Sequence, residues 1–264
     1  VTTFCSLLLA GYGCSSPQAN DAVQDLTQYV DPYIGSGGHG HVFVGANVPY
    51  GLVQLGPSSI PQEWDWTSGY HISDSTVIGF PHMHLSGTGI GDLHDITLMP
   101  VTGEVTYARG VESDQTSGLW SYSDRSKEVV KPGYYATHLL RYDVDVELTA
   151  TKRVGFHKYT FNQKENAAVV FDLQNGGCWD SPTKAYINKV DDKTIEGYRY
   201  SSGWANDQRV FFVAEFSEPI TSLDVIVDRG EAVADKGEGK IVYARANVDA
   251  QKPVYVKVAL SPTS

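Results

Sequence analysis

The protein is a chain of 264 residues in which 41% are hydrophobic and 19% are charged, a composition typical of a folded globular protein and not of a disordered chain. Its 31 acidic and 20 basic residues give a formal net charge of −11 at pH 7. This acidic balance argues against nucleic acid and anionic membrane surfaces as partners, because binding to phosphate requires clustered basic side chains. The first basic residue is Arg109, so residues 1–108 are the chemically unusual part of the chain.

An apolar run over residues 4–14 precedes a polar stretch, and the two together predict an export leader. The run is too short to span a bilayer, which needs about 20 residues, so it is typical of the end of a secretory hydrophobic region. Small residues before Cys14 are similar to a bacterial lipobox, although Gly11 stands where Leu is usual. We therefore expect residues 1–26 to be a signal-peptide remnant and lipoprotein tether, cut at its N-terminus.

In this interpretation Cys14 carries the lipid, and the membrane is contacted only through that anchor. The protein is then exported to the bacterial periplasm or the outer-membrane surface. Cys5 would be removed with the leader, which leaves Cys178 without a disulfide partner. We expect Cys178 to be a buried, unreactive thiol.

Residues 31–103 are dense in glycine, and their strands are expected to be short and their loops long. Glycine permits close backbone approach and positive φ, which are both expected at a binding edge. A rim of tight hairpins is the structural alternative. Six of the eight histidines also lie in the first 108 residues.

Two His-x-His pairs, at His39 and His41 and at His82 and His84, lie within this region. On a strand, residues two apart share a face, so each pair could present two imidazoles to one point. Three interpretations stay open: a transition-metal site completed by Asp92 or Asp95, a polar ligand site, and histidines that serve the structure.

The segment Glu63-Trp-Asp-Trp66 is typical of a sugar-binding loop. An indole face stacks on the C–H surface of a sugar ring, and a carboxylate accepts hydrogen bonds from its hydroxyls. Burial of both tryptophans under the edge of the fold is the alternative. The Gly-rich run after Leu85 does not indicate a nucleotide site, because it lacks the lysine of a P-loop.

From about residue 140 the sequence alternates apolar and polar residues with a period of two, as half-buried strands require. The pattern predicts strands near residues 143–148, 153–161, 167–173, 209–216, 223–227, 240–245 and 254–260. No apolar stripe at helical spacing extends over ten residues. We therefore predict an all-β fold, an antiparallel β-sandwich over residues 27–264, with substrate-facing loops in residues 31–103.

Four motifs in order resemble the N-terminal part of glycoside hydrolase family 92. They are VDPYIGSGGHGH (residues 30–41), GANVPYGLVQLGP (residues 45–57), SGYH (residues 68–71) and GFPHMHLSGTGIGD (residues 79–92). The resemblance covers about residues 29–264. It implies a bacterial exo-acting α-mannosidase that is calcium-dependent and inverting, and that acts on mannose-containing glycans, either N-glycans or mannan.

The resemblance further implies a two-domain enzyme, in which an N-terminal β-sandwich meets a helical (α/α)6 domain. In that family both catalytic carboxylates and most calcium ligands belong to the helical domain, which is absent from this chain. We therefore expect no catalytic residue and no metal ligand here, and no activity of the chain alone. The C-terminal helical domain of the same protein is the expected partner.

Matching the family motifs position by position places the substrate contacts of this chain in its loops. Trp64 is expected to stack on the leaving-group side of the scissile bond. The full set of expected substrate-binding residues is Trp64, Asp65, Tyr70, His71, His82, His84, Ser86, Thr88 and Asp92. Two alternatives remain: a stand-alone carbohydrate-binding module of a surface lipoprotein, and a metal hydrolase that uses the histidines.

Overall fold

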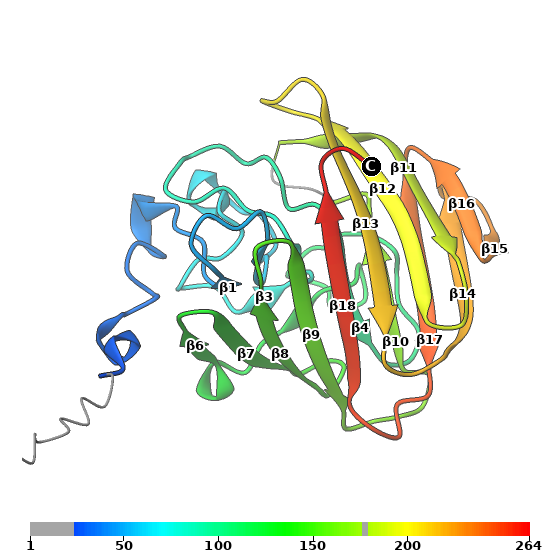
Figure 1. Ribbon diagram of the computed structural model, residues 1–264, viewed down its shortest axis with the longest axis horizontal. Helices are drawn as coiled ribbons and strands as arrows, with labels where there is room; N and C mark the ends of the chain where they lie inside the picture. Colours follow the sequence, from blue (N-terminus) through cyan, green and yellow to red (C-terminus); the bar gives the residue numbers. More distant parts are fainter. Residues whose placement is uncertain (1–23, 176–178) are drawn as a thin grey trace, which may run out of the picture.

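A computed structural model describes residues 24–175 and 179–264 of the chain. Two large antiparallel sheets form a sandwich, and a layer of loops lies beside it (Figure 1). The larger sheet has nine strands in the order β16-β11-β12-β13-β18-β9-β8-β7-β6, and the smaller has five in the order β15-β14-β17-β10-β4. The antiparallel sandwich predicted from the sequence is confirmed.

The strands of the nine-stranded sheet are β6 (Val129–Lys131), β7 (Tyr134–Leu139), β8 (Val144–Ala150), β9 (Val154–Phe161), β11 (Ser181–Lys189), β12 (Thr194–Ser202), β13 (Gln208–Phe216), β16 (Lys236–Gly239) and β18 (Val254–Ser261). Those of the five-stranded sheet are β4 (Thr97–Val101), β10 (Ala168–Asp172), β14 (Ile220–Val227), β15 (Ala232–Ala234) and β17 (Val242–Val248). The short strands β1 (Ala46–Asn47), β2 (Gln54–Leu55), β3 (Thr76–Val77) and β5 (Ser121–Tyr122) form two small sheets.

Alternation of side chains explains why the nine-stranded sheet has one buried and one open face. Along β18 the side chains of Val254, Val256 and Val258 are buried, while Tyr255 and Lys257 between them are exposed. The five-stranded sheet is different, because every residue of β4 and β10 is buried. Between the two sheets Phe171 of β10 stacks on Phe212 of β13, with ring centroids 5.7 Å apart. This contact lies in the continuous core of the sandwich.

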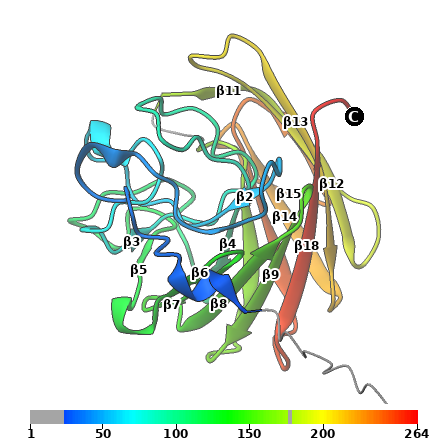
Figure 2. The same cartoon turned by 60° about the vertical axis from the view of Figure 1, so that its left-hand side comes forward.

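Residues 31–96 form the loop layer, which lies to one side of the long strands (Figure 2). It contains the short strands β1 to β3, of which β1 and β2 lie against β8. The helical elements of the described residues are single 3-10 turns, η1 (Leu26–Tyr29), η2 (Gly38–Gly40), η3 (Trp64–Trp66) and η4 (Arg125–Lys127). The long-loop organisation expected for residues 31–103 is therefore what the structure shows.

Within the described residues no helix is long and apolar enough to cross a bilayer. The lipidation predicted at Cys14, nearly all of the predicted tether and the thiol of Cys178 lie outside the described residues. The domain boundary at residue 27 stays a prediction.

Candidate functional site

Trp64 is the most prominent ring of the loop layer. It begins the 3-10 turn η3, and 52% of its surface is exposed. Its Nε1 donates a hydrogen bond of 3.0 Å to the carbonyl oxygen of Gly89. A Cβ at Gly89 would lie 2.4 Å from the indole, so only glycine allows the ring to lie against this backbone. The indole is therefore held in place while one of its sides stays open.

A histidine pair supports the same tryptophan. His41 meets Trp64 edge to face with ring centroids 4.2 Å apart. Asp65 Oδ1 binds His39 Nδ1 at 2.7 Å and His41 Nε2 at 3.2 Å. The hydrogen bond to Asp65 raises the pKa of His39, and the same bond lowers the pKa of Asp65. The first His-x-His pair thus converges on a carboxylate and a tryptophan.

A hollow of about 440 Å³ opens beside Trp64. It is lined by Pro61, Gln62, Glu63, Trp64, Arg109 and Trp179. A second hollow of about 500 Å³ shares Arg109 and Trp179 and continues toward Asn175 and Asp180. Trp179 is half exposed, and its backbone N–H donates to Gly91 at 3.1 Å. Two tryptophans and a guanidinium therefore border one depression, which suits the apolar faces and the hydroxyls of a sugar.

Tyr70 and His71 lie below this surface. Tyr70 is 3% exposed and donates to Glu128 Oε2 at 3.1 Å, while the guanidinium of Arg125 lies 4.7 Å from its ring centroid. Burial raises the pKa of the Tyr70 hydroxyl. The His71 ring stacks on Trp66 at 4.3 Å, and its Nδ1 pairs with Ser73 Oγ at 2.7 Å. His71 therefore supports the turn that carries Trp64, while Tyr70 joins the loop layer to η4.

His82 belongs to a buried chain of hydrogen bonds. Its Nδ1 faces the carbonyl oxygen of Ile96 at 2.5 Å, so this nitrogen carries the hydrogen. Its Nε2 must then accept from His157 Nε2 at 2.9 Å, and His157 Nδ1 accepts from the hydroxyl of Tyr159 at 2.7 Å. Burial lowers the pKa of His82 to about 4 and that of His157 well below its usual value. All three rings are uncharged at neutral pH.

His84 lies in a second buried group. Its Nδ1 donates to the carbonyl oxygen of Gln54 at 2.8 Å, and Ser58 Oγ lies 3.4 Å from its Nε2 and 3.3 Å from His94 Nδ1. Burial lowers the pKa of His84 to about 4 and that of His94 well below its usual value. The group joins three loops through neutral hydrogen bonds.

The remaining predicted residues lie on the run from Ser86 to Asp92. Ser86 is exposed, and its Oγ accepts from the backbone N–H of Phe43 at 3.1 Å. Thr88 is half-buried. Asp92 is 3% exposed and accepts from the backbone N–H groups of Trp204 and Ala205 at 3.1 and 2.9 Å, so its carboxylate holds the turn between β12 and β13.

The structure therefore divides the predicted residues in two. Trp64 lies at the surface hollow, Asp65 follows it in η3 and binds the histidine pair, and Ser86 and Thr88 lie on the loop that includes Gly89. Those with contacts inside the protein are Tyr70, His71, His82, His84 and Asp92. Their contact with sugar stays a prediction, and the structure assigns each of them a supporting contact.

Known proteins give the family context for this arrangement. The family model of the glycosyl hydrolase family 92 N-terminal domain matches residues 29–261. The chain belongs to this family. A solved family 92 α-mannosidase of Bacteroides thetaiotaomicron, in complex with mannoimidazole, is 34% identical with a TM-score of 0.86, over 91% of this chain and 33% of its own.

Two further proteins are similar to the chain in fold or in part of its sequence. A family 92 inverting mannosidase of Bacteroides thetaiotaomicron is 21% identical with a TM-score of 0.72, over 90% of this chain and 32% of its own, which shows a shared fold. A protein of Arthroderma benhamiae named as an uncharacterized secreted glycosidase is 28% identical over 144 residues, which are 52% of this chain and 17% of that protein. The family 92 domain described here thus spans about a third of the solved relatives.

The family 92 domain has no cation site of its own among residues 24–175 and 179–264. No group of three or more His, Cys, Asp or Glu side chains there could hold a metal ion. Three carboxylates of the loop layer are bound to other groups, Asp65 to two histidines, Asp92 to two backbone N–H groups and Asp74 to Trp66 Nε1 at 2.7 Å. The described residues therefore do not fit the calcium that the resemblance implies.

Sequence reasoning missed Arg109, Trp179 and His157 as parts of the site and its support. Trp179 precedes Asp180 as Trp64 precedes Asp65, and this repeated Trp-Asp pair was a usable signal. His157 occupies a buried position of β9, between outward-facing neighbours, and a polar residue at such a position also indicates a special role. Arg109 gave no signal beyond being the first basic residue.

Proposed function

We propose that this chain is the substrate-recognising N-terminal domain of an exported exo-acting α-mannosidase that acts on N-glycans or mannan. The observation that carries the proposal is the half-exposed Trp64 indole, fixed by Gly89 and His41 at the border of a hollow. The identity of 34% to an α-mannosidase solved with mannoimidazole supports the choice of substrate.

In this proposal the open side of Trp64 stacks on the leaving-group sugar. Trp179 contacts the same sugar ring from the other part of the hollow. Both histidines bind Asp65 through Oδ1, and Oδ2 of the same carboxylate accepts a hydroxyl of the sugar. Arg109 at the shared border donates to sugar oxygens. Stacking and hydrogen bonds orient the sugar. This domain therefore contributes to catalysis by positioning the substrate and not by proton transfer.

The chemical step belongs to the rest of the protein in this proposal. Inversion requires a general acid and a general base whose carboxyl groups are about 6.5–9.5 Å apart. Because Asp65, Asp74 and Asp92 are engaged within this domain, we assign both catalytic carboxylates and most of the calcium ligands to the C-terminal helical domain. The chain alone is then inactive.

Export is also part of the proposal, supported by the relative that is named as a secreted glycosidase. Lipidation of Cys14 would place the enzyme at the cell envelope, where large glycans are accessible. The alternative of a stand-alone carbohydrate-binding module would use the same hollow without hydrolysis.

Release of mannose from α-1,2-mannobiose by the longer protein tests the proposal. We expect Trp64→Ala to lower kcat/KM at least about tenfold, because the stacking contact with the leaving-group sugar is lost. The control is Tyr255→Ala, an outward aromatic of β18 far from the hollow, which should retain wild-type activity. The present chain should show no turnover and should bind the sugar.

Turnover by residues 1–264 alone would refute the assignment of both catalytic carboxylates to the C-terminal domain. An unchanged kcat/KM in Trp64→Ala would refute the role of the hollow. Absence of hydrolysis by the longer protein, with retained sugar binding, would establish the binding module instead.

A further inference from the structure

The outer face of the nine-stranded sheet carries a row of aromatic rings that the loop site does not use. Tyr186 of β11 pairs in register with Tyr198 of β12, and Tyr198 pairs with Phe211 of β13. Ring centroids are 5.4 Å apart for the first pair and 5.8 Å for the second. Tyr200, two residues along β12, stacks on Tyr198 at 4.6 Å. We call Tyr186, Tyr198, Tyr200 and Phe211 the aromatic row.

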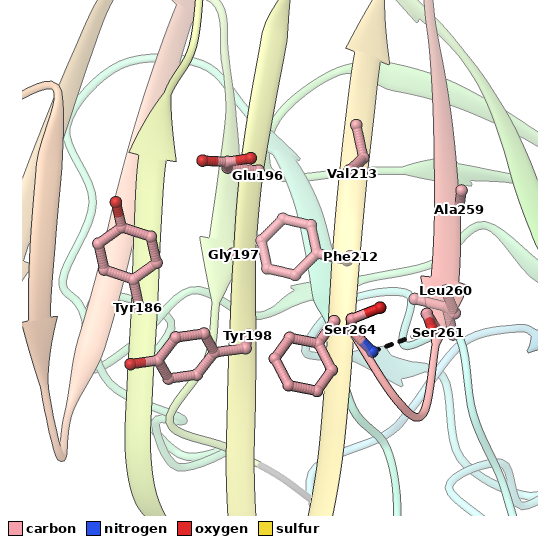
Figure 3. Close-up of a pocket in the computed structure, with 11 residues that line it drawn as sticks. Tyr186, Glu196, Gly197, Tyr198, Phe212, Val213, Ala259, Leu260, Ser261 and Ser264 are labelled. Carbon is pink, nitrogen blue, oxygen red and sulfur yellow. Dashed lines mark hydrogen bonds between the residues drawn. The ribbon is translucent and has the colours of Figure 1, made fainter.

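A shallow groove of about 340 Å³ extends from β11 to β18, and Tyr186, Tyr198 and Phe211 of the row line it (Figure 3). The rings of Tyr186 and Tyr198 lie over the strands in Figure 3 with their faces toward the viewer. Val213 and Ala259 border the groove beyond the rings, and Leu260 and Phe212 belong to its floor. Its size is that of a small-molecule site, within the usual range of about 300–1,000 Å³.

Charges around the row are paired with one another. Lys184 binds Glu238 at 2.9 Å, and Tyr198 donates to the same carboxylate. Arg209 binds Asp207 at 3.0 Å while its guanidinium lies 5.1 Å from the ring centroid of Tyr200. These two pairs cancel, and Glu196 at the groove, which accepts from the amide of Asn188 at 3.2 Å, adds one carboxylate to a face of aromatic rings and polar groups. An uncharged ligand with both apolar faces and hydroxyls fits it best.

From these observations we propose that the aromatic row is a second carbohydrate-binding surface, which holds a neutral pyranose chain across β11, β12 and β13. Each of the four rings is half-buried, and the part of each face that is still open gains free energy when the C–H surface of a sugar ring covers it. The carboxylate of Glu196 and the hydroxyl of Tyr186, both at the groove, bind hydroxyls of the same chain. The surface would hold the enzyme on polymeric substrate while the loop site takes a chain end. Only the choice of mannan as ligand rests on the proposed function.

A protein partner fits the same surface less well. A stable protein interface buries about 800 Å² on each partner, around a core that is depleted in charged residues. Here the aliphatic side chains at the groove are few, and Lys184, Glu196, Arg209 and Glu238 stand among or beside the rings. Association of two copies is therefore the competing outcome of the test and not the proposal.

Affinity electrophoresis of residues 1–264 through gels that contain yeast mannan tests the proposal. We expect mannan to retard the wild-type chain, and we expect Tyr198→Ala to weaken the apparent affinity about tenfold. Tyr186→Ala should weaken it less, because this ring lies at one end of the row. Tyr255→Ala is the matched control on the same outer face, and it should retain the retardation within about twofold.

Thermal unfolding of each variant checks that the variant is folded, so that a loss of binding is not caused by unfolding. The double variant Tyr186→Ala/Tyr198→Ala removes two rings of the row, so that the result does not depend on one side chain. Retardation that survives in the double variant would overturn the proposal, as would a wild-type chain that mannan does not retard. A dimer of the wild type that Tyr198→Ala dissociates would also overturn it, in favour of a second copy. Because the assay does not use mannosidase turnover, retardation that survives in the double variant removes this surface and leaves the proposed function intact. Failure of mannosidase turnover in the longer protein leaves this surface intact.

Discussion

The hollow beside Trp64 and the aromatic row place rings at the surface by opposite means, a half-exposed indole in the first and four half-buried rings in the second. At the hollow, a 3-10 turn and a glycine loop hold one indole through a hydrogen bond to Gly89. In the row, regular strand pairing places Tyr186, Tyr198 and Phe211 side by side. The first arrangement depends on many specific contacts below the surface, and the second depends only on register and alternation.

This difference predicts how each region responds to change. The loop layer should lose its form when one buried polar contact is removed, because few backbone ladders support it. The outer sheet should tolerate loss of a surface ring, because its strands stay paired. The experiments below test this contrast, beginning with the contact that joins the two regions.

Arg199 provides that contact, and its removal should have the largest effect. It is fully buried on the inner side of β12, where it binds Asp95 of the loop layer at 2.6 Å and Asp180 at 2.8 Å. Arg199→Ala leaves two buried carboxylates without a positive partner, and we expect it to lower the free energy of unfolding by about 3–5 kcal/mol. Guanidinium denaturation measures this loss.

The matched control is Arg209→Ala, in the strand paired with β12. Arg209 is exposed and binds the exposed Asp207, so its removal should cost less than about 1 kcal/mol. Equal losses for the two arginines would contradict the link between loop layer and sheet.

The second-largest expected effect is a loss of stability of the loop layer in acid. Burial lowers the pKa of His82 and of His84 from 6.5 to about 4, so the unfolded chain binds protons at a higher pH than the folded protein does. Their contribution is complete above pH 6.5 and is lost as the pH falls toward 4, by at most about 3 kcal/mol for each histidine. The free energy of unfolding measured at pH 7.5, 6 and 5 checks this expectation.

His84→Gln removes one titrating group while its amide can still donate to Gln54. This variant should show a shallower fall in stability between pH 7.5 and 5 than the wild type does. An identical slope would mean that His84 does not titrate with the expected shift.

His39 should give the smallest effect, of the opposite sign. Its pKa is raised by Asp65, so its contribution is complete below pH 6.5 and is lost as the pH rises through its pKa in the folded protein. NMR titration should place this pKa above 6.5, and Asp65→Asn should return it toward that value. A pKa that Asp65→Asn leaves unchanged would remove Asp65 from the support of Trp64.

Strand alternation made the sandwich predictable, because period-2 patterns such as those of β8, β9 and β18 specify a buried face directly. The strands β11 and β12 were not predicted individually. Their inward positions include Arg199 and Gly197, which weaken the apolar pattern, while tyrosines on the outer face add apolar character there.

The loop site was predictable in part. The exposed Trp64 and its neighbour Asp65 follow from composition and motif, since a tryptophan between polar residues in a turn has few partners of its own. Sequence could not show that His82 faces His157, because that contact joins residues far apart through a fold that loops determine. Nor could spacing separate a ligand-facing histidine from one that a backbone carbonyl binds.

The pairing of β4 with β10 has a consequence for the order of folding. β4 directly follows the loop layer in the sequence. Its partner strand β10 follows β9, so it is synthesised about 70 residues later. Contacts of such long sequence separation form slowly, because the closure of a long loop precedes any gain from pairing. The loop layer is therefore expected to stay incompletely organised until β10 has been synthesised. Chaperones that keep the first hundred residues apart from other strands should aid the folding of such a chain.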